Sequence, residues 1–315
     1  MADCSSVFHE PWWLDATAPG KWREISIEDG GRCVARFPFV DRRILSLRLL
    51  VSPPLCPRLG PLITLDSPRT ESVNRRVDHL VHGLIDQLPP ADLFRAVLRP
   101  QVASWVPFHQ RGFRVDPQLS YVIDDLSDLD RVWSGIAGHT RRVIRRAKEA
   151  LRVERDTDAR RLGVMSTSTF ARQGLGLPYP AEVLDRTVQE MSARGCGTVL
   201  TALDESDRVH ASAICVWDRD RAWYLGGGGD TTLRSSGAGS LLLWELIRES
   251  SRHVGQFDFE GSMVPSIGKY FRNFGGRRET CYLVTRTSRR FAPVWALRQA
   301  RRRAEQNRLG EDVRP

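Results

Sequence analysis

The chain has 315 residues, enough for two ordinary domains or one large one. Hydrophobic residues make up 41% and charged residues 27%, the balance of a soluble globular protein, and no apolar run approaches the roughly 20 residues of a membrane helix. The formal net charge is +9, and the six cysteines are scattered without a C-x-x-C pair, which argues against a disulfide framework or a zinc ribbon. The first 13 residues lack the apolar segment of a secretory signal, so we expect a cytoplasmic protein.

The first 116 residues alternate short apolar stretches with turn signals, as mixed α/β units do. Residues 24–28 and 33–37 alternate polar and apolar side chains around Asp29-Gly30-Gly31, and this pattern predicts a β-hairpin. Four prolines interrupt the strand-like segment 45–65, where we expect an edge strand and a loop. The other elements expected here are helices at 11–16 and 73–88 and a strand at 93–97.

The second half opens with a short strand expected at 120–124 and one long helix expected at 128–151, with Ser127 as its cap. Residues 198–228 hold three apolar stretches separated by two polar turns, which predicts a three-stranded meander. The other elements expected here are helices at 164–172, 181–194, 239–252, 265–274 and 291–307, and strands at 256–260 and 280–285.

Two segments show a hint of internal repetition. Residues 24–39 and 200–217 each contain a strand, an acid-rich turn, an arginine and a second strand in the same order. Two copies of one mixed unit would explain this order. We therefore expect an α/β (α+β, mixed-sheet) fold with modules at 1–116 and 117–290, followed by a basic helix or tail at 291–315.

The clearest motif is the run Arg234–Gly239, RSSGAG, between an expected strand and an apolar helix. It matches R/Q-x-x-G-x-G/A, the pyrophosphate loop of acyl-CoA-dependent N-acyltransferases of the GNAT type. Glycines let the backbone approach a phosphate, and the N–H groups and dipole of the next helix favour its negative charge. A flexible strand-to-helix turn is the alternative explanation for Gly226–Gly229. The candidate cofactor-binding residues are Arg234, Ser236, Gly237, Ala238 and Gly239.

Two carboxylates mark the strand expected at 256–260. Asp258 and Glu260 share one face of that strand, and the flanking phenylalanines share the other. An amine must lose a proton when it attacks a carbonyl carbon, and a carboxylate with a raised pKa can accept that proton. Alternatively, one acid caps the following helix or pairs with an arginine.

The short helix expected at 265–274 carries three further candidate catalytic residues. Lys269, one of only three lysines, and Arg272 are separated by three positions, so both could face one anion. Tyr270 could donate a proton to a leaving group. Phe271 and Phe274 are expected in the core.

Basic side chains gather in two segments. Residues 140–148 contain five of them, and residues 286–303 contain seven arginines and no acid. Such patches attract polyanions such as tRNA, nucleotide phosphates or anionic lipid, although two solvated helix faces would have the same composition. His79 and His82 lie three apart on a helix without further ligands nearby, so we expect no metal.

The runs 235–251 and 257–276 resemble the C-terminal module of Fem-type aminoacyltransferases, and residues 133–150 are similar to that family's basic helix. The resemblance covers 120–285 well and 11–116 loosely, and it implies two tandem GNAT-like modules. The family's Phe-Lys-x-x-aromatic-Gly signature is kept approximately, with its lysine at Lys269 or replaced by Arg272. No helical run is long enough for the coiled-coil arm of the peptidoglycan enzymes, which favours a shorter relative.

This resemblance implies a bacterial enzyme that forms an amide with aminoacyl-tRNA as co-substrate and no bound cofactor. The acceptor would be an amine on a peptide, a cell-wall precursor or a natural product. The alternatives are an acyl-CoA-dependent N-acyltransferase and a non-catalytic binding module of the same fold. The residues expected to contact tRNA are Arg141, Arg142, Arg145, Arg146, Arg301 and Arg302.

Overall fold

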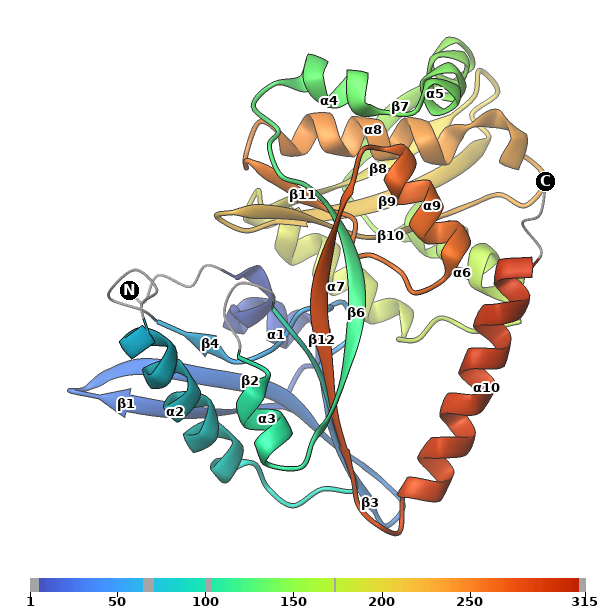
Figure 1. The fold of residues 1–315 in the computed structure, drawn as a ribbon. Coiled ribbons are helices and arrows are strands. Elements are labelled where there is room, and N and C mark those ends of the chain that lie inside the picture. The colour runs from blue at the N-terminus through green and yellow to red at the C-terminus, as the bar shows by residue number, and fades with distance from the viewer. Residues whose placement is uncertain (1–5, 65–70, 100–103, 173, 312–315) are drawn as a thin grey trace.

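The structure is a computed structural model that describes residues 6–64, 71–99, 104–172 and 174–311, with side chains in the last helix given up to residue 301. One mixed sheet of 12 strands runs through the molecule, in the order β1-β2-β3-β5-β12-β6-β11-β10-β9-β8-β7, with β4 paired to β2. Figure 1 shows the long strands β6 (Arg114–Ile123) and β12 (Arg277–Thr287) crossing the middle of the molecule between two α/β halves.

The N-terminal half packs two helices on its part of the sheet. Its core joins apolar residues of the longer helix to aromatic side chains of the strands, among them Phe37 and Phe94, whose ring centroids are 5.7 Å apart. The elements are β1 (Trp22–Asp29), β2 (Arg32–Ile44), β3 (Leu47–Val51), β4 (Leu62–Ile63), α2 (Glu71–Gln87), β5 (Leu93–Leu98) and α3 (Val106–Gln110).

The C-terminal half places helices on both faces of its strands (Figure 1). The elements are α4 (Leu129–Gly135), α5 (Gly138–Ala150), β7 (Arg152–Asp156), α6 (Arg160–Arg172), α7 (Ala181–Ala193), β8 (Gly197–Leu203), β9 (Val209–Trp217), β10 (Arg221–Gly229), η2 (Arg234–Ser236), α8 (Ala238–Ser250), β11 (Gln256–Asp258), α9 (Pro265–Asn273) and the separate basic helix α10 (Ala292–Glu311).

The two halves share elements. Strand β12 pairs with β5 of the first half and with β6, and β6 also pairs with β11 of the second. The division expected at residue 116 falls inside β6. The chain's start also crosses over, because η1 (Val7–His9) and α1 (Pro11–Thr17) pack against α7 in the core of the C-terminal half.

Three details differ from the sequence expectations. The single helix expected at 128–151 is two helices, because Ile136 takes extended φ/ψ angles between Gly135 and Gly138, and glycine is a weak helix former. Its cap is Asp128, which accepts the Arg131 N–H at 2.9 Å, and not Ser127. Strand β7 was not predicted. Glycines 226–228 lie in β10, as the expected meander has them, and not in the alternative strand-to-helix turn.

Candidate functional site

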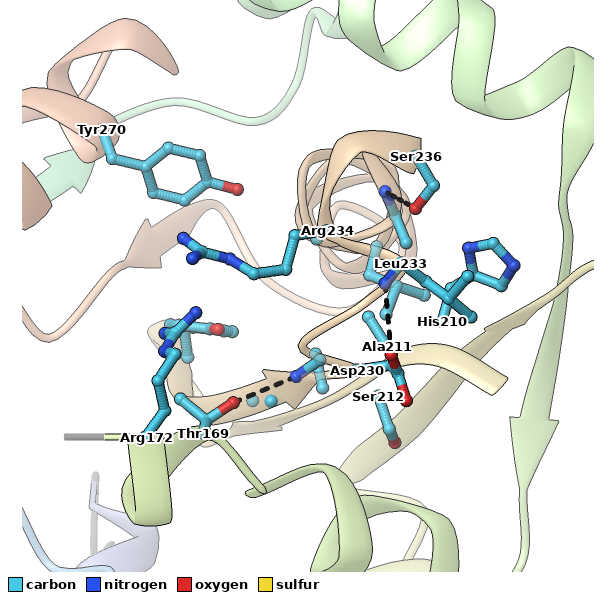
Figure 2. A pocket seen from close by; sticks show the side chains of 18 residues that line it. Thr169, Arg172, His210, Ala211, Ser212, Asp230, Leu233, Arg234, Ser236 and Tyr270 are labelled. Atoms are coloured by element: carbon cyan, nitrogen blue, oxygen red, sulfur yellow. Dashed lines mark hydrogen bonds between the residues drawn. The ribbon is translucent and has the colours of Figure 1, made fainter. Parts of the chain in front are cut away.

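A cavity of about 400 Å³ opens at the N-terminal end of α8 (Figure 2). Strands β9 and β10 form its floor, and α6, η2, α8 and α9 contribute its walls. Helix α8 packs on one face of the strands, in the core that includes Leu241 and Leu242, whereas Leu162 of α6 belongs to the core on the other face. The cavity therefore reaches both faces of the sheet around the end of β10.

The sheet opens at this point because β10 and β11 separate. Their parallel pairing ends at Trp223 and Asp258, whereas β10 continues beside β9 as far as Gly229. A bulge between Tyr224 and Gly226 bends the strand where the separation begins. One edge of β10 beyond the bulge is left without β11 as a partner, and an extended substrate can lie along such an edge.

The glycines of β10 allow helix α6 to pack closely on the strand. A Cβ atom at Gly228 would lie 2.0 Å from the backbone oxygen of Met165, and Gly229 N donates to Thr169 Oγ1 at 3.1 Å. Because the obstacle is backbone, a side chain at Gly228 would push α6 away from the cavity.

Gly228→Ala is therefore expected to destabilise the protein by about 1–3 kcal/mol. Gly255→Ala is the matched control, since a Cβ there meets nothing within 4 Å. Thermal unfolding of both variants measures the effect, and equal melting temperatures would contradict the packing argument.

The RSSGAG loop forms the wall above β10. Gly237 has φ +77°, and a Cβ atom there would meet Val143 Cγ1 of α5 at 2.6 Å, so this glycine brings the loop against the basic helix. Ser236, Ala238 and Gly239 line the cavity. Ala238 N donates to Ser236 Oγ at 3.4 Å and Ser240 N to Gly237 O at 3.0 Å, whereas the Gly239 N–H has no acceptor among the described residues. The loop thus has the geometry expected for a phosphate site, a role that stays a prediction.

Two arginines provide the positive charge of the cavity. Arg234 extends from η2 away from the end of α8, and Arg172 reaches the same region from the end of α6 (Figure 2). Neither forms an ion pair within the described part of the chain. Partial burial and the charge of Arg234 lower the pKa of Arg172 from its usual range.

Tyr270 is the residue of α9 that lines the cavity. Its hydroxyl lies 3.3 Å from Ser240 Oγ, beside the first turn of α8, and a Cβ atom at Gly239 would lie 4.0 Å from it. Burial raises the pKa of Tyr270 to about 12, partly offset by the Ser240 hydroxyl. The phenol therefore stays protonated at neutral pH and has a proton to give.

Lys269 and Arg272 lie on α9 but do not line the cavity. A helix turns about 100° per residue, so the orientation that points Tyr270 inward points both neighbours elsewhere. Lys269 is exposed, and Arg272 donates to the Tyr121 hydroxyl at 3.1 Å with its guanidinium over that ring. The cations of the cavity are Arg172 and Arg234 instead.

Glu260 follows β11 directly where the strands separate. Its φ is +60°, a conformation that costs a non-glycine residue about 1 kcal/mol or more and that clusters at functional sites. Its Oε1 is buried without a hydrogen-bond partner among the described residues. Burial raises the pKa of Glu260 well above its ordinary value, the charge of Arg58 lowers it, and Asp258 raises it.

Asp258 is held inside the protein. Its carboxylate accepts hydrogen bonds from the Ser120 hydroxyl, from Arg221 Nη1 at 2.9 Å and from the backbone N–H of Glu260 at 2.7 Å. It is fully buried, and Arg221 also pairs with Glu279 at 2.7 Å. Because both carboxylate oxygens already accept hydrogen bonds, Asp258 is better suited to hold the backbone of Glu260 in place than to accept a proton from a substrate.

Several residues of the site have no recognisable pattern in the sequence. Arg172 and Thr169 end an ordinary helical stretch, and Tyr224 is one apolar residue of a strand. Arg58 sits among the prolines of the loop after β3, yet it is 2% exposed and its Nη1 lacks a partner in the described chain. Only the packing of distant segments brings these residues to the site.

The basic residues of α5 lie beside the loop. Arg142, Arg145, Arg146 and Lys148 are exposed and Arg141 is half-buried, and Arg145 stacks over Trp133 at 5.5 Å. Figure 1 shows α10 on the lower flank of the molecule and α5 at the top. Arg301 on α10 is exposed, whereas the side chain of Arg302 lies outside the described residues.

The described residues contain no group of three metal-ligating side chains. His82 bonds to Gln110 at 3.0 Å and accepts from Arg111. Among the described helices, none combines the length and apolar character needed to cross a bilayer.

Comparison with known proteins identifies the type of fold. Residues 137–264 match the acetyltransferase (GNAT) domain family. No curated protein matches the sequence significantly.

Several solved structures have the same fold over most of the chain. The FemX crystal structure is 10% identical, with 88% of this chain and 92% of that chain covered and a TM-score of 0.64. L-PGS from Bacillus licheniformis is 13% identical, with 92% of this chain and 90% of that chain covered and a TM-score of 0.53. A tandem GNAT protein from the clavulanic acid biosynthesis pathway is 12% identical, with 87% of this chain and 86% of that chain covered and a TM-score of 0.51.

The expected fold of tandem GNAT-like modules is confirmed, as is the resemblance to Fem-type proteins at the level of the fold. The domain match and these neighbours support an acyltransferase.

Proposed function

We propose that this chain, which carries a GNAT domain match at residues 137–264, is an amide-forming aminoacyltransferase that uses aminoacyl-tRNA as its donor. Its acceptor would be an amine on a peptide, a cell-wall precursor or a natural product. The observation that supports this proposal best is the positive charge of helix α5 beside the cavity. None of the five basic side chains of α5 forms an ion pair in the described chain, and Val143 of the same helix touches the RSSGAG loop at Gly237.

The segment that follows α5 in the sequence differs from it in charge pairing. Four arginines of this segment all pair with acidic side chains, namely Arg152, Arg155, Arg160 and Arg161. A surface that leaves its arginines unpaired attracts a polyanion and gains affinity by releasing counterions. A polynucleotide on α5 would continue into the cavity through the loop, where the esterified end of the donor would lie.

The reaction requires two proton transfers, one from the acceptor amine and one to the leaving oxygen. As the acceptor nitrogen attacks the ester carbonyl, its proton passes to the Glu260 carboxylate, and the new C–N bond forms. The bond between the carbonyl carbon and the ribose oxygen then breaks, and that oxygen takes the proton of the Tyr270 hydroxyl. Glu260 and Tyr270 return to their starting states by proton exchange with water.

The donor site is tested by removing charge from α5. The triple variant Arg142→Gln/Arg145→Gln/Arg146→Gln is expected to weaken tRNA binding and to reduce the slope of log affinity against log salt by about two to three. Filter binding across a salt series measures both values.

The matched control removes three paired, exposed arginines, Arg131, Arg160 and Arg208, by the same substitution. It should leave the slope of the wild-type protein nearly unchanged. If both triple variants bind tRNA alike, charge on α5 is not the determinant and the tRNA donor loses its support.

An acyl-CoA donor is the second candidate, and the RSSGAG loop beside the cavity favours it. Coenzyme A should then raise the melting temperature of the wild-type protein. Gly237→Glu should abolish that rise, because it places a like-charged side chain at the φ +77° turn beside the phosphates.

A further inference from the structure

Arg172 and Arg234 approach one part of the cavity from elements on opposite faces of the sheet. Figure 2 shows both guanidinium groups turned toward the same region, below Tyr270. Two like charges held near one another repel, and the charge of Arg234 acts on Arg172. An anion between them would convert this repulsion into two charge-assisted contacts.

Among the described residues, no carboxylate forms an ion pair with either arginine. Asp230 lines the cavity, but its Oδ1 accepts hydrogen bonds from Thr232 N at 2.7 Å, Thr232 Oγ1 at 2.6 Å and Leu233 N at 3.1 Å. The carboxylate is thus held in the turn that follows β10. No salt bridge joins it to either arginine in the described chain.

The position of Arg172 points to the acceptor rather than the donor. The loop at 234–239 and α8 lie on one face of the sheet, and α6 lies on the other. Phe257 and Phe259 lie in the core beneath α8, whereas Glu260 interacts electrostatically with Arg58 and with Cys56, and Cys56 belongs to the core on the opposite face. Glu260 does not itself line the cavity, whereas Arg172 lines it from α6, so an acceptor held at Arg172 would approach Glu260 from this face.

We propose that Arg172 and Arg234 bind an oxyanion of the acceptor, a carboxylate or a phosphate, so that the acceptor is an acidic amine. This assignment rests on the proposed function for the direction of the reaction. The oxyanion would fix the acceptor at the junction of the two faces and leave its amine free to approach Glu260. Positioning of this kind accelerates a reaction because the two reacting groups are already held in the geometry that the reaction needs.

The test is an anion titration by calorimetry with succinate and inorganic phosphate as probes. The wild-type protein should bind at least one probe, and Arg172→Gln and Arg234→Gln should each weaken it by about tenfold or more. Arg172→Lys should restore part of the loss, since lysine keeps the charge but not the planar fork. Arg160→Gln, on the same helix but paired to Asp158, is the matched control.

The preferred probe distinguishes a carboxylate from a phosphate on the acceptor. A repeat with saturating coenzyme A or deacylated tRNA separates acceptor from donor: retained binding supports the proposal. Displacement of the probe assigns both arginines to the donor and overturns it, as does equal binding by the wild-type protein and Arg172→Gln. The titration measures binding and needs no turnover. If the probe binds in a way that depends on Arg172 but no transfer is observed, the proposed function fails and the anion site does not.

Discussion

Glu260→Gln is expected to lower the rate of amide transfer by about 10²- to 10⁴-fold, the usual contribution of a positioned general base. Glutamine keeps the size of the side chain and cannot take a proton from the amine. Single-turnover measurements with the labelled donor would show the loss in the chemical step. A variant that retains the wild-type rate would remove Glu260 from the mechanism.

The pH dependence gives a second readout of the same residue. Because the pKa of Glu260 is raised by burial, transfer should fall as the pH drops through that raised value, and the acidic limb should lie above the range of an ordinary glutamate. The change Arg58→Met removes the nearby positive charge and should move this limb to still higher pH.

Stability separates a catalytic role for Glu260 from a structural one. The folded protein holds the proton of Glu260 more tightly than the unfolded chain, so its stability falls as the pH rises from the ordinary glutamate pKa to the raised one. Glu260→Gln removes that penalty. Its melting temperature at neutral pH should therefore equal or exceed that of the wild-type protein, whereas a structural acid would leave a less stable variant.

Asp258→Ala is expected to destabilise the protein by about 3–5 kcal/mol, the range for breaking a buried ion pair. The change leaves the Arg221 guanidinium, which is 4% exposed, without one of its carboxylates, and it removes the acceptor of the Glu260 N–H. Chemical denaturation with a linear extrapolation measures the loss.

Asp124→Ala is the matched control, because Asp124 pairs with Arg277 at 2.6 Å where both side chains are about half exposed. Exposed pairs contribute about 1 kcal/mol or less. Equal losses in the two variants would contradict the view that Asp258 supports the site from within.

The sequence predicted those elements whose signals are local. The hairpin around Gly30 and the meander of β8, β9 and β10 follow from alternation and turn residues, and the RSSGAG loop follows from its glycines. The break at Ile136 was not predicted, because the apolar stripe continues through it and only the two glycines mark the change.

The site was predicted less completely, since its geometry depends on long-range packing. Tyr270 and the loop were identified by spacing, and the structure brings both to one cavity. Spacing could not decide which face of α9 turns inward, so Lys269 and Arg272 were expected there as well. Arg172 reaches the cavity only because Gly228 lets α6 approach β10, and no local pattern records that contact.

Donor consumption distinguishes the proposed tRNA donor from the acyl-CoA alternative. The purified wild-type protein and Glu260→Gln would be incubated with radiolabelled aminoacyl-tRNA, with labelled acyl-CoA in a parallel reaction, and with a panel of acidic amines. We predict that the wild-type protein moves label from the tRNA to an amine and that the variant does so at least about 100-fold more slowly. Label that leaves only the acyl-CoA, or leaves the tRNA at the same rate with both proteins, would contradict the account.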